Sequence, residues 1–194
     1  MIIMSKPFGK FIEVSDSVDY LIISFSSTRL PIQDRWRNNS LSANFLAAYW
    51  GMFFPGDNNS SQLSQAEVKD IISYTVNELL ENAVKFNYEP SRMPITIRIY
   101  PFAELLRIYV TNSIHPQAVW QFQQYLQILL TEDLGELYIR QIEHNVSDES
   151  HTESRLGYLT ILNDYQVQLA WKFDTIQQDP EIIMVTTMAQ LAIK

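Results

Sequence analysis

Residues 77–86 read NELLENAVKF, and this segment says the most about the architecture of the chain. If it is helical, Glu78, Asn82 and Lys85 lie at positions i, i+4 and i+7 and share one face. A neighbouring stripe of apolar side chains would pack the helix on a sheet: Ile72, Val76, Leu79, Ala83 and Phe86. The polar edge then presents the carboxylate, amide and ammonium groups of a phosphate-and-metal site. By spacing alone, the same three residues also fit an ordinary solvated helix face.

The composition indicates a folded, acidic protein. The 194 residues are 46% hydrophobic and 12% aromatic, which suits one domain with a substantial core. The net charge of −8 and the scattered basic residues argue against a nucleic-acid groove. Cysteine is absent and the histidines lie far apart in sequence, so neither disulfides nor thiolate or histidine metal clusters are expected. The start does not resemble a signal peptide, and no apolar run approaches the roughly 20 residues of a membrane span. We expect a cytoplasmic protein that binds neither membrane nor nucleic acid.

The N-terminal third predicts a short extension, residues 1–63, packed on a core of residues 64–194 within a single domain. Its expected elements are two strands around a turn, then a loop and an apolar helix: Phe8 to Val14, Ser15 to Ser17, Tyr20 to Ser26, Pro31 to Asn39, and Leu41 to Phe54.

The remaining sequence alternates helices with antiparallel hairpins. Ser64 to Glu67 is a capping box that opens the long helix containing residues 77–86. The later hairpins are Ile95–Tyr100 with Leu105–Thr111 and Val167–Phe173 with Ile182–Thr187, and the later helices are Pro116–Leu130, Glu132–Asn145 and Arg155–Asp164. This segregation predicts an α+β fold, a two-layer sandwich of helices on a mixed, mostly antiparallel sheet.

Residues 64–188 resemble the histidine kinase-like ATPase superfamily, which includes sensor histidine kinases, anti-sigma serine kinases, gyrases and a class of chaperones. Residues 77–86 are similar to its N-box helix. The resemblance implies that Glu78 is a general base, that Asn82 binds the magnesium of ATP, and that Lys85 lies near phosphate. Residues 154–159 resemble the later glycine box, which faces the phosphates at a helix N-terminus and of which Gly157 alone remains.

The chain departs from the superfamily after the strand expected to end at Thr111. There the superfamily has an Asp, whose carboxylate accepts a hydrogen bond from the adenine amine, followed by glycines. This chain has Asn112-Ser113-Ile114-His115-Pro116. Asn112 keeps a carbonyl acceptor, but Ile114 and Pro116 stand where the backbone would approach the base. The whole chain has only five glycines, so no glycine-rich loop is expected to hold a triphosphate. ATP and magnesium are the implied cofactors, and we expect ATP to bind weakly or not at all.

Over its full length the chain resembles a family of small cyanobacterial regulators related to anti-sigma serine kinases. The similar stretches are residues 35–39, 77–87, 156–164 and Thr186-Thr187-Met188. Such proteins are thought to work in partner-switching circuits with an anti-sigma-antagonist-like (STAS) domain and a phosphatase. The resemblance implies a protein partner of this kind, and self-association into a homodimer is also compatible with it.

Arg35, Trp36 and Arg37 are the candidate partner-binding residues, because Arg and Trp are favoured interface anchors. An ordinary exposed loop fits them equally well. Three interpretations remain for the protein. It is a regulator with a degenerate nucleotide site that acts by protein contact, which we favour, or an active ATP- and magnesium-dependent protein serine/threonine kinase, or an unrelated α+β binding module.

Overall fold

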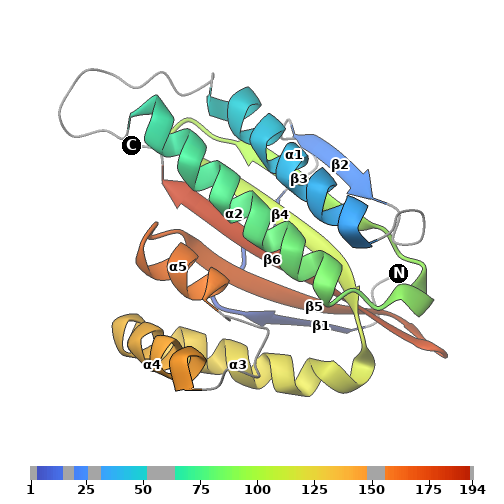
Figure 1. Cartoon of the computed structure of the whole chain (residues 1–194). Helices are drawn as coiled ribbons and strands as arrows, with labels where there is room; N and C mark the ends of the chain where they lie inside the picture. Colours follow the sequence, from blue (N-terminus) through green and yellow to red (C-terminus); the bar gives the residue numbers. More distant parts are fainter. Residues whose placement is uncertain (1–3, 15–19, 26–31, 52–63, 148–155, 193–194) are drawn as a thin grey trace.

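The computed structural model describes residues 4–14, 20–25, 32–51, 64–147 and 156–192, with only the backbone described for residues 32–39 and 51. These residues form a six-stranded sheet in the order β1-β5-β6-β4-β3-β2, and every pairing is antiparallel (Figure 1). The strands are β1 (Met4–Phe8), β2 (Leu21–Phe25), β3 (Ile95–Pro101), β4 (Leu105–Ile114), β5 (Gln168–Gln178) and β6 (Glu181–Ala192). The α-helices are α1 (Ile32–Gly51), α2 (Gln65–Lys85), α3 (Val119–Thr131), α4 (Leu134–Ser147) and α5 (Gly157–Asn163).

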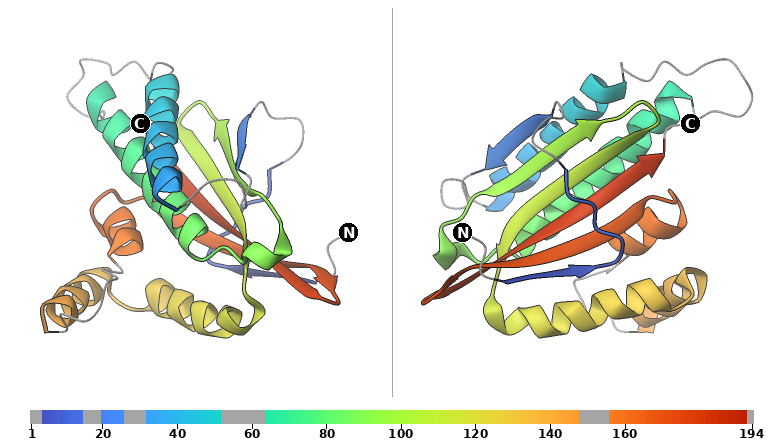
Figure 2. Two further views of the ribbon diagram at one scale, coloured as in Figure 1. Left: turned by 45° about the vertical axis from the view of Figure 1, so that its right-hand side comes forward. Right: turned by 180° about the vertical axis from the view of Figure 1, so that it is seen from behind.

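Helices cover one face of the sheet, which we call the front face. α1 and α2 lie side by side across it, α5 lies over β5, and α3 and α4 run along the β1–β5 edge (Figures 1 and 2). The α+β sandwich predicted from the sequence is therefore confirmed. Within the described residues, no helix combines the length and apolar character needed to cross a bilayer.

α2 forms as its sequence predicts. Ser64 caps it, with its hydroxyl accepting from the Glu67 N–H at 3.2 Å while the Glu67 carboxylate accepts from the Ser64 N–H at 2.7 Å. The stripe from Ile72 to Ala83 is buried against the sheet, with Leu79 only 2% exposed. Phe86 is the exception to the predicted stripe, since 50% of it is exposed. The helix ends at Lys85, so Phe86 is the C-cap and leaves the buried face.

The N-terminal strands differ from the prediction. β1 is Met4–Phe8 rather than Phe8 to Val14, and β1 and β2 form opposite edges of the sheet. Gly9, with a φ of 71°, follows β1. Residues 10–14, which we call the strap, then lie on the back face, where Phe11, Ile12 and Val14 pack against a small apolar cluster (Figure 2). Apolar side chains in extended backbone can cover a sheet as well as pair with it, so the pattern did not separate the two. The expected turn at Ser15 to Ser17 lies outside the described residues.

The loop predicted over residues 31–39 is also wrong, because α1 begins at Ile32. Its later turns are anchored on the core by Ala43, Leu46, Ala47 and Trp50, which are buried. Helix propagation costs little once such an anchor exists, so the polar residues before it continue the helix. The helix is described to Gly51, and the remainder of the predicted segment lies outside the described residues.

The two later hairpins and three later helices are present, with strands longer than predicted. β4 continues past Thr111 to Ile114, so Asn112 lies inside a strand instead of following it. β4 is paired along this length with β6, where Asn112 is opposite Val185. A 3₁₀ turn, Pro116–Ala118, then leads directly into α3. This strand-to-helix transition positions one wall of the site described next.

Candidate functional site

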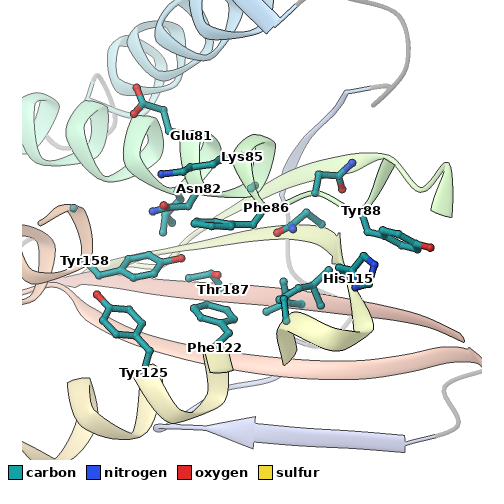
Figure 3. A pocket seen from close by; sticks show the side chains of 18 of the residues that line it. Glu81, Asn82, Lys85, Phe86, Tyr88, His115, Phe122, Tyr125, Tyr158 and Thr187 are labelled. Carbon is teal, nitrogen blue, oxygen red and sulfur yellow. The ribbon is translucent and has the colours of Figure 1, made fainter. Parts of the chain in front are cut away.

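A cavity of about 1090 Å³ lies on the front face, between the C-terminal half of α2, strands β4 and β6, α3 and the start of α5 (Figure 3). The five cavity residues expected from the sequence all line it: Glu78, Asn82, Lys85, Asn112 and Gly157. They come from three elements that are distant in the chain, so the fold brings them together.

The α2 side of the cavity carries Glu78, Asn82 and Lys85. Burial raises the pKa of the Glu78 carboxyl, and the negative charge of Glu81 raises it further, while a hydrogen bond with Tyr74 opposes the shift. Tyr74 also hydrogen-bonds Thr160 on α5, so it joins the two helices beside the carboxylate. The Lys85 ammonium lies 5.3 Å from the centre of the Phe86 ring. A carboxylate with a raised pKa next to an amide and an ammonium can accept a proton near a bound phosphate.

Gly157 is required by close approach rather than by backbone conformation. A Cβ atom at this position would overlap the carboxylate of Glu78. The absence of a side chain therefore lets the first residue of α5 approach the polar edge of α2. This contact gives a physical reason for a glycine here, although the other glycines of the resembling box are missing.

The sheet forms the floor of the cavity through Asn112 and Thr187, which are 5% and 6% exposed. Asn112 pairs with Val185 and Thr187 with Val110, so both side chains face the same side of the sheet. The Asn112 Nδ2 donates to the backbone carbonyl of Ser113 at 2.8 Å. This hydrogen bond fixes the amide and leaves its Oδ1 as an acceptor, with no partner among the described residues. The floor therefore offers neutral polar groups of known orientation.

Aromatic rings make up much of the wall, and sequence reasoning gave none of these rings a role in ligand binding. They are Phe86, Tyr88, His115, Phe122, Tyr125 and Tyr158 (Figure 3). Such rings suit a ligand that has a planar apolar part and a few polar groups. Phe122 and Tyr125 share a face of α3 at spacing i, i+3, which is the only local signal that pointed toward them.

Ile114 and His115, in the segment that replaces the expected Asp-and-glycine turn, also line the cavity. Ile114 is the last residue of β4, and His115 caps the 3₁₀ turn by accepting from the Gln117 N–H at 3.2 Å. Asn87 lines the same wall, and its buried Nδ2 has no partner within the described residues. An unpaired buried amide donor is costly, and a polar ligand would satisfy it.

The described residues of the cavity offer few protein ligands for a metal ion. Among the described residues, no group of three His, Cys, Asp or Glu side chains gathers where it could hold an ion. Mg²⁺ is commonly bound by one or two protein groups together with water and phosphate oxygens. The amide of Asn82 lines the cavity and could serve as one such protein ligand.

The proposed partner residues are placed only in part. Arg35, Trp36 and Arg37 fall within α1, and their side chains lie outside the described residues. The described part of α1 presents Leu41, Phe45 and Tyr49, which are 60%, 56% and 37% exposed. The Phe45 and Tyr49 rings stack with their centres 6.0 Å apart. We call these three residues the α1 stripe.

Comparison with known proteins adds no assignment. No protein-family model matches the chain, and a search of curated proteins finds no match. Function therefore has to be inferred from the cavity, its electrostatics and the exposed surfaces.

Proposed function

We propose that the protein is a cytoplasmic signalling regulator of the histidine kinase-like ATPase type, which binds a nucleotide in its cavity and acts through contact with a protein partner. The convergence of Glu78, Asn82, Lys85, Asn112 and Gly157 on one cavity supports this most strongly. If the sequence match were due to chance, residues from α2, β4 and α5 would not be expected to line the same cavity. Convergent polar groups and a carboxyl of raised pKa in a large pocket are typical of a functional site.

The proposed binding mode follows from the chemistry of the walls. Lys85 and Asn82 suit phosphates and their Mg²⁺, while Asn112 and Thr187 suit the hydrogen-bonding edge of a base. The rings of Phe122 and Tyr125 can pack against the planar part of the ligand. We expect weak affinity, because no glycine-rich loop is found in the described part of the chain to hold a triphosphate with backbone N–H groups.

Calorimetric titration with ATP and magnesium tests this proposal. Wild type should bind with an affinity weaker than low micromolar, and Lys85→Ala and Asn112→Ala should each weaken binding further. Tyr109→Phe is the matched control, because this residue lies on the back face with its hydroxyl on the Ile12 carbonyl. No binding at millimolar ATP, or binding unchanged in both cavity variants, would overturn the nucleotide assignment.

The partner-binding part of the proposal places the contact on α1. No charged residue occurs between Asn38 and Gly56, although the chain has a net charge of −8. The α1 stripe itself therefore adds no like charge against an acidic protein partner. We favour a STAS-type domain as this partner, on the strength of the resemblance. Phe45→Ser should reduce its capture in a pull-down, whereas Trp120→Ser, at a residue 71% exposed on α3, should not.

A protein serine/threonine kinase is the second candidate, and one observation favours it. Glu78 is half-buried, has a raised pKa and shares the cavity with Asn82. A general base works best when its pKa lies closer to the working pH than that of an ordinary carboxyl. Transfer of the ATP γ-phosphate to a protein hydroxyl, with Glu78 accepting the hydroxyl proton, is the reaction that this geometry would support.

A further inference from the structure

The two edge strands of the sheet, β1 and β2, are protected to different degrees. An edge strand exposes backbone groups that can pair with another chain, and proteins usually block such edges with Lys, Pro or a covering helix. β1 contains Lys6 and Pro7, and α3 runs along its side of the sheet (Figure 1). β2 reads LIISF and contains neither Lys nor Pro. β2 is therefore the edge that can accept another strand.

The hydrogen-bond pattern of the sheet shows which backbone groups of β2 point outward. The Tyr88 N–H donates to the Ser113 carbonyl at 3.1 Å, so the backbone of Ser113 faces the β3 side of β4. Backbone groups alternate in direction along a strand, and the registers of β3 and β2 carry this alternation to the edge. Ile22 and Ser24 therefore direct their N–H and C=O groups away from β3. Following the registers through β6 and β5 places Pro7 outward on β1, where it offers no donor.

The side chains of β2 suit a second copy of the same strand. Those of Leu21, Ile23 and Phe25 pack on the front-face core but are only half-buried. In an antiparallel pair centred on Ile23, Leu21 lies opposite Phe25 of the partner subunit, and aliphatic–aromatic pairs of this kind stabilise sheets. Ile22, which is 46% exposed on the back face, lies opposite Ser24. Because both of these residues direct their backbone groups outward, the pair can exchange two hydrogen bonds.

The distribution of charge favours the same occupant. Each copy carries a net charge of −8, so most of the two surfaces repel each other. No charged residue occurs between Asp19 and Arg29, or between Asn38 and Gly56, a range that includes much of α1 over this side of the sheet (Figure 1). In β3 the one charge is Arg98, at least about 14 Å from its counterpart across three strand spacings. That separation exceeds the Debye length at physiological salt, so two copies can meet at β2 with little repulsion.

We propose that β2 is a self-association edge, at which two copies of the chain pair antiparallel about Ile23. The pairing joins two six-stranded sheets into one of twelve strands. Because the far edge is blocked at Pro7, the assembly closes as a two-fold dimer and does not extend into a fibre. A five-residue strand gives a small interface, so the dimer should be concentration-dependent. No residue of β2 lines the cavity, and the dimer is therefore independent of the proposed nucleotide site.

Sedimentation equilibrium of the full chain over a wide range of concentrations tests the proposal. The mass of wild type should rise from 22.6 kDa toward twice that value. Ser24→Pro should weaken association about tenfold or more, because two-fold symmetry removes two outward donors. The change leaves the β2–β3 pairing intact, since this N–H does not face β3. Ser5→Pro, the same change at an outward position of β1, is the matched control and should associate as wild type does.

A single thiol tests the register of the pair. The chain has no cysteine, so Ile23→Cys places one thiol at the two-fold axis. There Ile23 faces its counterpart in a pair without hydrogen bonds, where the Cα atoms are close enough for a disulfide. Under mild oxidation Ile23→Cys should form a covalent dimer much faster than Ser5→Cys, at an exposed residue of β1.

Three results would overturn the proposal. They are a wild type that stays monomeric at every concentration, an association that Ser24→Pro leaves unchanged, and equal rates of covalent dimer formation in Ile23→Cys and Ser5→Cys. If Ser24→Pro does not fold, wild-type sedimentation and the two cysteine variants still decide the question. Nucleotide binding by wild type is measured separately, so neither failure implies the other.

Discussion

The front and back faces of the sheet both carry polar side chains, but they use them differently. On the back face these groups bond mainly to each other or to the strap. Examples are Tyr109 to the Ile12 carbonyl at 2.8 Å, Arg107 to Gln190 at 2.7 Å, and Lys172 to Glu13 at 2.7 Å. On the front face, Asn112 and Thr187 present polar atoms to the cavity. Most back-face polar groups are paired internally, with the buried Asp174 Oδ1 as an exception among the described residues, whereas the front face offers groups that a ligand can satisfy.

This difference separates structural polar residues from candidate functional ones. A buried hydrogen bond that is already formed stabilises the fold and has little to give a ligand. A buried group held in position but unpaired costs stability, and proteins retain such groups mainly at sites. Changes on the front face should therefore alter binding or transfer more than stability. Changes on the back face should alter stability more than binding or transfer.

The largest expected effect is on phosphate transfer, under the kinase interpretation. Glu78→Ala should lower ATP-dependent phosphorylation by about 10²–10⁴-fold, the usual value of a positioned base. Asn82→Ala should cost at least as much, because metal and phosphate positioning carry most of this chemistry. Radiolabelled phosphate transfer to candidate partner domains measures the effect, with Glu143→Ala on the exposed side of α4 as control. Full transfer in Glu78→Ala would remove that residue from the mechanism.

Gly157→Ala should have the next largest effect, because the added methyl group meets the Glu78 carboxylate. The end of a Glu side chain can rotate away, so the cost in unfolding free energy should be near the low end for overpacking, about 1 kcal/mol. Displacement of the Glu78 carboxylate should lower nucleotide binding or phosphate transfer more than it lowers stability. Chemical denaturation of Gly157→Ala, Glu78→Ala and the double variant tests the contact. The two changes should be non-additive, with the second relieving the first, and strict additivity would contradict this.

Tyr109→Phe is the complementary change on the back face. Burial raises the pKa of Tyr109 to about 12, so it is a neutral donor to the Ile12 carbonyl at 2.8 Å. Removing the hydroxyl leaves that carbonyl without its donor and should cost about 1 kcal/mol of unfolding free energy. Nucleotide affinity should not change. A Tyr109→Phe variant that kept full stability but bound nucleotide differently would contradict the assignment of back-face groups to stability.

The sequence was informative where local signals were strong. The capping box at Ser64 and the apolar period of α2 define that helix without any tertiary contact, and alternating runs separated by turns define the two later hairpins. The strap was missed because its role depends on Tyr109 and Met188, which are distant in sequence. The start of α1 was missed because packing on the core overrides weak propensity in the preceding residues.

The site was predictable only through the resemblance, and then incompletely. That resemblance pointed to Glu78, Asn82, Lys85, Asn112 and Gly157, which the fold brings to one cavity. It gave no role to Thr187, although the pair Thr186-Thr187 stood within a similar stretch. Which threonine faces the cavity depends on the register between β6 and β4, since adjacent residues of a strand point to opposite faces.

The smallest expected effect is the change in stability caused by ionisation of Glu78. The sign of this change follows from the direction of the pKa shift of Glu78. Burial raises the pKa of Glu78 above its ordinary value of 4.5, so the folded protein binds this proton more tightly than the unfolded chain. The contribution of Glu78 to stability is therefore most favourable at low pH and is lost as pH rises from about 4.5 through the folded pKa. Glu78→Gln should melt at a slightly higher temperature than wild type at pH 8, and the difference should vanish near pH 4.

The gain should stay well below about 1.4 kcal/mol, the equivalent of one pKa unit, because solvent screens a half-buried side chain. Melting curves of both proteins at the two pH values measure it, with Glu143→Gln, at an exposed residue of α4, expected to show no pH-dependent gain. A Gln variant less stable than wild type at pH 8 would mean that ionised Glu78 is satisfied within the fold, as the back-face groups are. In that case Glu78 would belong with the structural residues, and the front face would lose its candidate base.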